Sequence, residues 1–279
     1  ILAGVPCDFR LDYGRQIRRA ATLVSANRSR HDLKLNRKPD YGIQADPGVF
    51  LVDLARAAPA TGGAWSDWRE TLGSRDRERE SEIEVQASES GEHVNPLALC
   101  RGVDRLLGEN SIVIADGGDF VGTASYIVRP RGPLRWLDPG AFGTLGVGAG
   151  FILGAAASFP GAQIWGIFGD GSVGYSLADF DTFVRHRIPV IAIVGNDACW
   201  SQIAREQVKL LDDDTGVMLA RTDYHRVAAG FGAGGLVIHS DEEIDDVLGQ
   251  ARDIAAGGHP VLVNVILDRS DFREGSLSI

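Results

Sequence analysis

From about Asn95 onward, short apolar runs alternate with segments whose apolar residues recur at helical spacing. The pattern predicts helices at 97–107, 177–185, 224–230 and 242–255, and strands at 111–116, 163–168, 189–195, 235–239 and 259–267. Strands that alternate with helices form a parallel sheet with helices on both faces. We therefore expect an α/β fold, whose ligands bind at the carboxyl ends of the strands.

The chain divides into three parts by composition. Residues 1–64 hold apolar runs at 1–5 and 22–24 and helical patterns at 13–23 and 49–58, which read as a βαβα remnant of a larger domain. Residues 65–92 are dense in Glu, Arg, Asp and Ser and predict a solvated helix or a linker. Residues 93–279 carry the regular α/β pattern. Because Ile1 opens inside an apolar run, we expect a further N-terminal portion of the protein.

Charge and cysteine content exclude several classes of partner. The net charge of −10 argues against general binding to nucleic acid or to an anionic membrane, both of which favour basic surfaces. Cys7, Cys100 and Cys199 are too far apart for a CxxC metal pair and are odd in number, so no disulfide framework is expected. A reducing compartment, and hence a cytoplasmic location, is the prediction.

A stretch without any charged residue, from Pro139 to Gly169, resembles a membrane span at first sight. Gly146, Gly150 and Gly154 stand at GxxxG spacing within it. However, nine of its residues are Gly, Pro160 interrupts it, and neither side carries a basic cluster. The stretch instead predicts a Gly-rich turn, a buried helix close to a sheet, and then a strand.

The segment around Gly169-Asp170-Gly171 carries the strongest chemical signal. An apolar strand ends there, and helical spacing begins a few residues later. Two glycines allow main-chain N–H groups to approach a bulky anion, and Ser172 adds a hydroxyl near the positive end of the helix dipole. The sequence therefore predicts a diphosphate site with the Asp170 carboxylate beside it.

A carboxylate next to a diphosphate requires a cation between them, and a hard ion such as Mg²⁺ takes oxygen ligands. The next predicted strand ends at Asn196, which would lie beside Asp170 because neighbouring strands are about 4.8 Å apart. The two side chains, a loop carbonyl near Ala198, phosphate oxygens and a water complete an octahedron. We therefore predict Asp170, Asn196 and Ala198 as metal ligands.

This pattern of GDG, about 25 residues and then Asn resembles the thiamine-diphosphate binding motif. In that family the positions of Asp170 and Asn196 supply metal ligands, and that of Ala198 supplies a carbonyl. The resemblance implies thiamine diphosphate and Mg²⁺ as cofactors, with Gly169, Gly171 and Ser172 at the diphosphate. It also implies that residues 93–279 are the diphosphate-binding domain and residues 1–64 the end of a Rossmann-like middle domain.

The turn before the uncharged helix shows a second similarity, to the acetohydroxyacid synthase branch. Gly143, Thr144 and Leu145 match a turn whose glycine carbonyl receives the aminopyrimidine N–H and whose aliphatic side chain supports the bent cofactor. Plain core packing is the alternative for Leu145. A dinucleotide-binding loop is disfavoured because the glycines lack GxGxxG spacing and a metal-pair motif stands downstream instead.

Two further groups complete the predicted site. Relatives in this family present polar groups to the diphosphate after the first strand, where Gly118, Asp119 and Phe120 stand. We expect the main chain there to bind the cofactor and the Asp119 side chain to cap the following helix. Trp200, Gln202 and Ile203 follow the predicted metal loop and are expected to face a small-molecule substrate.

The segments 180–190 and 195–198 and the closing segment from His259 are similar to the acetolactate synthase-like, 2-hydroxyacyl-CoA lyase group. That resemblance implies a carbon–carbon lyase or carboligase acting on 2-hydroxyacyl-CoA or 2-oxo acids. An acetolactate synthase catalytic subunit is one alternative. A non-catalytic assembly or regulatory subunit that keeps the cofactor fold is another. Binding of FAD or another nucleotide stays open.

The family places the glutamate that activates the cofactor in an N-terminal pyrimidine-binding domain, and nothing in this sequence corresponds to it. The resemblance therefore implies that this chain is the diphosphate anchor of a site that another domain completes, in a homodimer or homotetramer. We expect the 279 residues alone to be inactive.

Overall fold

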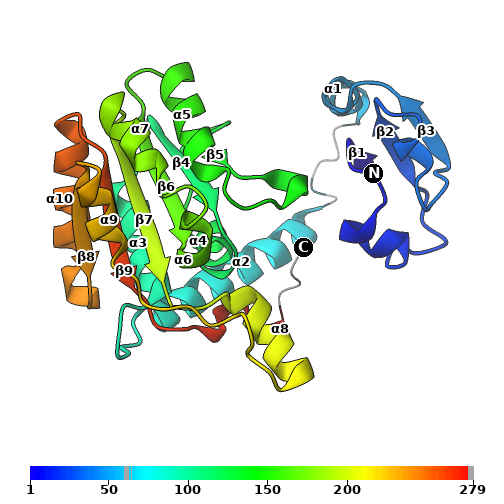
Figure 1. The fold of residues 1–279 in the computed structure, drawn as a ribbon. Helices are drawn as coiled ribbons and strands as arrows, with labels where there is room; N and C mark the ends of the chain where they lie inside the picture. The colour runs from blue at the N-terminus through cyan, green and yellow to red at the C-terminus, as the bar shows by residue number, and fades with distance from the viewer. Residues whose placement is uncertain (60–62, 64, 276–279) are drawn as a thin grey trace. The chain divides into compact units, whose positions relative to one another are not determined.

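The computed structural model describes residues 1–59, 63 and 65–275. The ends of the predicted 1–64 and 93–279 domains and of the closing segment, at 60–62, 64 and 276–279, lie outside these residues. Residues 1–77 form one compact unit and residues from 78 onward form a second (Figure 1). The boundaries at 64/65 and 92/93 remain predictions. The segment between them consists largely of one helix, α2 (Ser66–Ala87).

The first unit contains a small parallel sheet, helix α1 (Pro47–Ala57) and the first part of α2. Its strands are β1 (Leu2–Ala3), β2 (Val24–Asn27) and β3 (Tyr41–Gln44), in that spatial order. Helix α1 starts where the Asp46 side chain accepts the N–H groups of Gly48 and Val49. The short 3₁₀ helix η2 (Asp32–Lys34) lies between β2 and β3. The sequence analysis did not predict β3.

The helix predicted at 13–23 is wrong. The chain instead forms a kinked 3₁₀ segment, η1 (Phe9–Gly14), in which Asp12 and Tyr13 adopt left-handed backbone angles. The Arg37 guanidinium donates hydrogen bonds to the carbonyls of Gly14, Ile17 and Arg18. The Gly14 and Arg18 carbonyls also accept the N–H groups of Ile17 and Ala21, three residues later, as in isolated turns. A distant side chain and tight turns thus replace the α-helix, which local periodicity cannot reveal.

The second unit is built on a six-stranded sheet in which every neighbouring pair is parallel, in the order β5-β4-β6-β7-β9-β8. The strands are β4 (Ser111–Asp116), β5 (Trp136–Leu137), β6 (Gln163–Gly169), β7 (Val190–Asn196), β8 (Gly234–Ile238) and β9 (Val261–Ile266). The central strands are buried along almost their whole length, as their apolar runs predict. Five of these six strands are predicted from the sequence.

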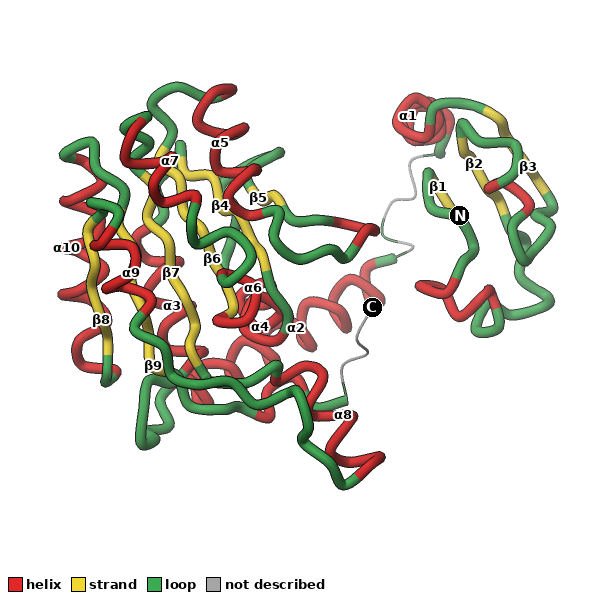
Figure 2. The backbone as a smooth tube through the Cα atoms, viewed as in Figure 1, coloured by secondary structure: helices red, strands yellow, loops and turns green. Residues whose placement is uncertain are grey.

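Helices cover both faces of this sheet (Figure 2), as the α/β prediction requires. One face packs against α3 (Pro96–Leu106), α4 (Asp119–Ile127) and α10 (Ile244–Ala256). The other packs against α5 (Gly148–Ser158), α7 (Asp179–Arg185) and α9 (Tyr224–Gly230). The remaining elements are α6 (Asp170–Val173), α8 (Ser201–Leu211), η3 (Gly140–Phe142), η4 (Asp241–Glu243) and η5 (Asp271–Arg273).

The uncharged stretch forms the turn, helix and strand expected of it. Helix α5 buries Gly148, Ala149, Ile152 and Ala155 against the sheet. A Cβ added at Gly148 would lie 2.4 Å from the Phe168 ring, so only glycine permits this close approach. Among the described helices, none combines the length and the hydrophobicity that crossing a membrane requires.

Candidate functional site

Asp170 and Asn196 occupy neighbouring strand ends. Gly169 and Gly195 are paired in the register of β6 and β7, so the residue after each lies at the same level of the sheet. Asp170 is 3% exposed and Asn196 is fully buried. Asp170 Oδ2 and Asn196 Oδ1 have no hydrogen-bond partner, although buried polar atoms are almost always paired. Two buried, unpartnered oxygens suit a hard cation.

The Asp170 carboxyl is in an environment that penalises its charge. Burial, and next the charge of Asp197, raise its pKa to about 6, although main-chain N–H groups of Gly171, Ala198 and Cys199 act in the opposite direction. A bound cation would offset this penalty, because an opposite charge favours the ionised carboxylate. The donor chemistry therefore fits a divalent ion.

Ala198 lies beside Asp170 in a left-handed conformation, with φ of 57°. Its carbonyl accepts the Leu219 N–H at 2.9 Å, which leaves one lone pair for another partner. In residues 1–59, 63 and 65–275, no three His, Cys, Asp or Glu side chains gather as a metal cluster. A cation at this position therefore requires amide and main-chain oxygens in addition to the Asp170 carboxylate.

Asp116 joins the loops around this position, a role that the sequence did not reveal. Its fully buried carboxylate accepts the N–H groups of Gly146 at 3.1 Å and Gly148 at 2.8 Å. Its carbonyl accepts a hydrogen bond from the Ser172 hydroxyl, which also lies 3.0 Å from the Gly169 carbonyl. One residue at the end of β4 thus fixes the loops before α5 and after β6.

We expect Asp116→Asn to lower the free energy of unfolding by about 1–3 kcal/mol, because an amide nitrogen would face one of the two N–H donors. Urea unfolding measures the change. Asp138→Asn is a matched control, because the exposed Asp138 carboxylate also accepts two N–H groups, from Trp136 and Gly140. A loss no larger than that of the control would contradict the role given to Asp116.

The prediction that the Asp119 side chain caps α4 is wrong. Gly118 is the N-cap residue and no side chain caps this helix. The Asp119 carboxylate instead accepts a hydrogen bond from Arg205 Nη2 of α8 at 2.7 Å, and both side chains are largely buried. The ion pair with Arg205 is stronger than the hydrogen bond of a helix cap, and it connects α8 to the start of α4.

The main chain before α4 lies close to the loop after β6. A Cβ at Gly117 would lie 2.9 Å from the Gly169 nitrogen, so these two loops meet only through glycine. Phe120 is buried, and its ring fills the space where a Gly195 Cβ would stand, at 2.4 Å. The ends of β4, β6 and β7 are therefore in direct contact.

The three residues predicted to face a substrate follow the same loops. The Trp200 ring lies against Gly171, whose added Cβ would be 2.5 Å from it. Gln202 lies over Gly118, with its Oε1 2.9 Å from the position of an added Cβ. Ile203 is 52% exposed. Two of the three thus border the predicted diphosphate loops.

The turn of Gly143, Thr144 and Leu145 precedes α5, next to the loop that Asp116 fixes. Gly143 has a left-handed φ of 59°, and Thr144 is exposed. Leu145 is only partly buried and is outside both hydrophobic clusters of the second unit. Its side chain is therefore not simply part of the core.

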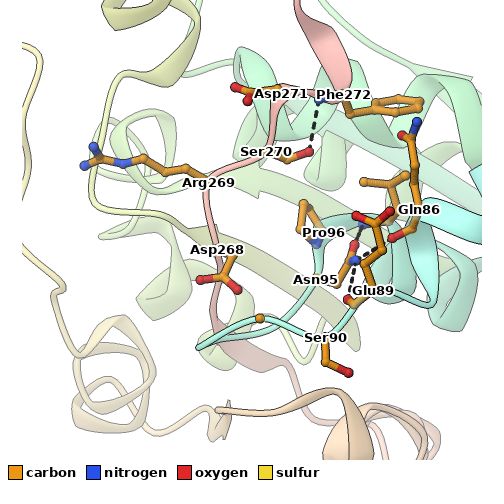
Figure 3. Close-up of a pocket in the computed structure, with 12 residues that line it drawn as sticks. Gln86, Glu89, Ser90, Asn95, Pro96, Asp268, Arg269, Ser270, Asp271 and Phe272 are labelled. Atoms are coloured by element: carbon orange, nitrogen blue, oxygen red, sulfur yellow. Dashed lines mark hydrogen bonds between the residues drawn. The ribbon is translucent and has the colours of Figure 1, made fainter.

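A cavity of about 450 Å³ lies elsewhere, between the end of α2, the start of α3 and the segment after β9 (Figure 3). Its lining includes Glu89, Asn95, Asp268 and Phe272, and the Ser270 hydroxyl accepts the Phe272 N–H there. None of the residues predicted for the site lines it. The loops at the strand ends, and not this cavity, contain the groups suited to a diphosphate and a cation.

Residues 116–265 match the family model described as "Thiamine pyrophosphate enzyme, C-terminal TPP binding domain". The chain therefore belongs to the thiamine pyrophosphate enzyme family and carries its cofactor-binding domain, as the GDG pattern predicts. The matched range begins at Asp116 and includes Asp170 and Asn196. The unpartnered oxygens of Asp170 and Asn196 and the glycine-lined loops fit a diphosphate with its metal.

Three curated relatives are similar along nearly the whole chain. 2-hydroxyacyl-CoA lyase 2 is 49% identical in Mus musculus and 48% identical in Homo sapiens, over 100% of this chain and 45% of each relative. The acetolactate synthase large subunit IlvG of Mycobacterium tuberculosis is 29% identical over 97% of this chain and 48% of its own length. The chain thus spans about half the length of the relatives it matches.

Proposed function

We propose that the full-length protein is a thiamine-diphosphate- and Mg²⁺-dependent carbon–carbon lyase or carboligase that acts on 2-hydroxyacyl-CoA or 2-oxo acids. The names of the more similar relatives favour 2-hydroxyacyl-CoA as the substrate class. The observation that carries the proposal is the pair of buried, unpartnered oxygens on Asp170 and Asn196, at neighbouring strand ends within the residues that match the cofactor-binding domain.

In this proposal Asp170, Asn196 and the Ala198 carbonyl bind Mg²⁺, which neutralises the diphosphate. Thiamine diphosphate, when bound, supplies the electron sink for cleaving or forming a bond next to a carbonyl. The main chain of Gly169, Gly171 and Ser172 lies at the start of α6, where N–H groups face an anion. Asp116 keeps Ser172 in place through its carbonyl.

The remaining predicted residues have positioning and binding roles. The main chain of Gly118, Asp119 and Phe120 borders the diphosphate from the β4 side. Gly143, Thr144 and Leu145 support the organic part of the cofactor, consistent with the partial exposure of Leu145.

Trp200, Gln202 and Ile203 border the space left for the substrate. Trp200 and Gln202 exclude water from the glycine loops against which they lie.

We further propose that an N-terminal pyrimidine-binding domain supplies the activating glutamate, within a homodimer or homotetramer. Exposed apolar side chains support a covering partner: Phe142, next to the predicted cofactor turn, is 92% exposed, and Leu210 and Leu211 at the end of α8 are 78% and 69% exposed. A cytoplasmic location is also proposed, supported by three free cysteines among the described residues.

Purified alone, the 279 residues are expected to turn over neither 2-hydroxyacyl-CoA nor pyruvate, because the activating glutamate lies elsewhere. The full-length protein is the positive control in two assays, of aldehyde release from 2-hydroxyacyl-CoA and of acetolactate formation from pyruvate. Turnover by the 279 residues would overturn the assignment of the glutamate to another domain.

The same two assays separate the alternative functions. Acetolactate formation from pyruvate, without cleavage of 2-hydroxyacyl-CoA, would favour the synthase that the 29% identical relative represents. Mg²⁺-dependent cofactor binding without either turnover in the full-length protein would favour a non-catalytic assembly or regulatory subunit. Cleavage of 2-hydroxyacyl-CoA that stops when Mg²⁺ is chelated is the expected result.

A further inference from the structure

We propose that Asn264 is a positioning residue that turns the Asn196 amide so that its oxygen, and not its nitrogen, faces the cation. This inference rests on the proposed role of Asn196 as a Mg²⁺ ligand. An amide presents an acceptor on one side and two donors on the other, and only the oxygen is a ligand for a hard cation. The orientation of the amide therefore decides whether Asn196 binds the ion.

Asn264 is a polar residue in the middle of a buried strand. It is fully buried in β9, where it pairs with Val194 of β7 and its sequence neighbours Val263 and Val265 are also fully buried. Side chains two residues apart on a strand lie on the same face. Asn196 is two residues after Val194, so the two amides lie diagonally on one face of the sheet.

Both hydrogen-bond donors of Asn196 are used on the side away from Asp170. Asn196 Nδ2 donates to Asn264 Oδ1 at 3.2 Å and to the Thr222 carbonyl at 3.1 Å. A rotated amide would place Asn196 Oδ1 against the Thr222 carbonyl oxygen, where two acceptors repel each other. The unpartnered Oδ1 is thereby directed away from these groups.

Asn264 is itself held in one orientation. Its Nδ2 donates to the same Thr222 carbonyl at 3.1 Å and lies 3.4 Å from His225 Nδ1. With its nitrogen committed to the Thr222 carbonyl, its oxygen must face Asn196. A single main-chain carbonyl thus orients both amides, and every polar atom of Asn264 has a partner, in contrast to Asn196.

The test compares Mg²⁺ requirements in the full-length protein. Calorimetry measures thiamine diphosphate binding at a series of Mg²⁺ concentrations, and Asn264→Leu removes the hydrogen bonds at similar volume. We expect the Mg²⁺ concentration for half-maximal binding to rise at least tenfold, within the 10–100-fold range typical when the partner of a metal ligand is removed. Asn264→Val, which suits a strand, is the second variant.

Leu262→Ala is the matched control, because Leu262 is fully buried two residues earlier on the same face of β9. It is expected to lower the melting temperature of the cofactor-free protein while leaving the half-maximal Mg²⁺ concentration within twofold of wild type. A purely structural role for Asn264 predicts the same behaviour for Asn264→Leu. A folded Asn264 variant with a wild-type Mg²⁺ requirement would therefore overturn the proposal.

Two further measurements distinguish a failure of the proposed metal site from a failure of the Asn264 proposal alone. If Mg²⁺ strengthens thiamine diphosphate binding neither in wild type nor in Asp170→Ala, the proposed metal site is wrong and the Asn264 proposal fails with it. If Mg²⁺ strengthens binding in wild type but not in Asp170→Ala, the metal site stands and the Asn264 variants decide the proposal. A crystal structure of the wild-type protein with Mg²⁺ and thiamine diphosphate tests the orientation of the Asn196 amide directly, without any Asn264 variant. Asn196 Nδ2 is expected within hydrogen-bond distance of Asn264 and Thr222, and an amide turned away from both would refute the inference.

Discussion

Replacing Asp170 with Asn is expected to make the cofactor-free protein more stable while abolishing its Mg²⁺-dependent affinity for thiamine diphosphate. The wild-type carboxylate is buried, and one of its oxygens has no partner. Removing this charge at nearly constant volume should raise the free energy of unfolding by about 1–2 kcal/mol at pH 7.5. The neutral amide cannot replace the carboxylate in balancing a divalent ion.

The stability gain has a defined pH dependence. The pKa of Asp170 is raised from 3.8 to about 6 in the folded protein, so its ionised form destabilises the fold at neutral pH. As the pH falls through 6 toward 3.8, the folded wild type takes up the proton and the difference between the two proteins should disappear.

Urea unfolding of the chelator-treated protein, together with calorimetry, measures both effects. Asp246→Asn on α10, an exposed position, provides the control and should alter neither quantity. An Asp170→Asn protein that still binds thiamine diphosphate with Mg²⁺ at wild-type affinity would contradict the metal assignment.

Gly171→Ala is expected to lower both stability and cofactor affinity. The added Cβ would lie 2.5–2.6 Å from three atoms of the Trp200 ring, so the ring or the loop after β6 must move. Overpacking of this kind costs about 1–3 kcal/mol. Because the same loop carries the main-chain groups assigned to the diphosphate, we expect at least a tenfold loss of thiamine diphosphate affinity, on the order of 1.4 kcal/mol.

A double-mutant cycle identifies the cause. In a Trp200→Ala background the added methyl group meets no ring, so Gly171→Ala should cost at least 1 kcal/mol less, about the coupling expected of contacting residues. Gly150→Ala is a control, because nothing lies within 4 Å of its added Cβ. Equal costs of Gly171→Ala in the two backgrounds would show that Trp200 does not press on Gly171.

The sequence was sufficient to predict those parts of the fold that depend on local pattern. The apolar runs of β6 and β7 and the residues that end them led to the adjacency of Asp170 and Asn196, which the strand register confirms. Parallel sheets make this inference possible, because successive strands that are neighbours end at the same edge. The family match then confirmed the cofactor.

The parts that could not be predicted depend on partners distant in sequence. The sequence predicted that the Asp119 carboxylate caps a helix, but this carboxylate forms an ion pair with Arg205, which is 86 residues away. Asp116 and Asn264 act through hydrogen bonds across 32 and 68 residues, to Gly148 and Asn196. Helix α8 has an amphipathic pattern with no fully buried residue, so its packing gives little signal.

The hydrogen bonds of Asp116 also bear on how such proteins diversify. Its bonds to Gly146, Gly148 and Ser172 join residues of a single domain and include none of the residues assigned to the substrate. If Gln202 and Ile203 face the substrate, as proposed, the loops that Asp116 joins can stay constant while exchanges at these two positions admit a different reactant. This modularity is consistent with one stretch of chain aligning with relatives named for a lyase and for a synthase.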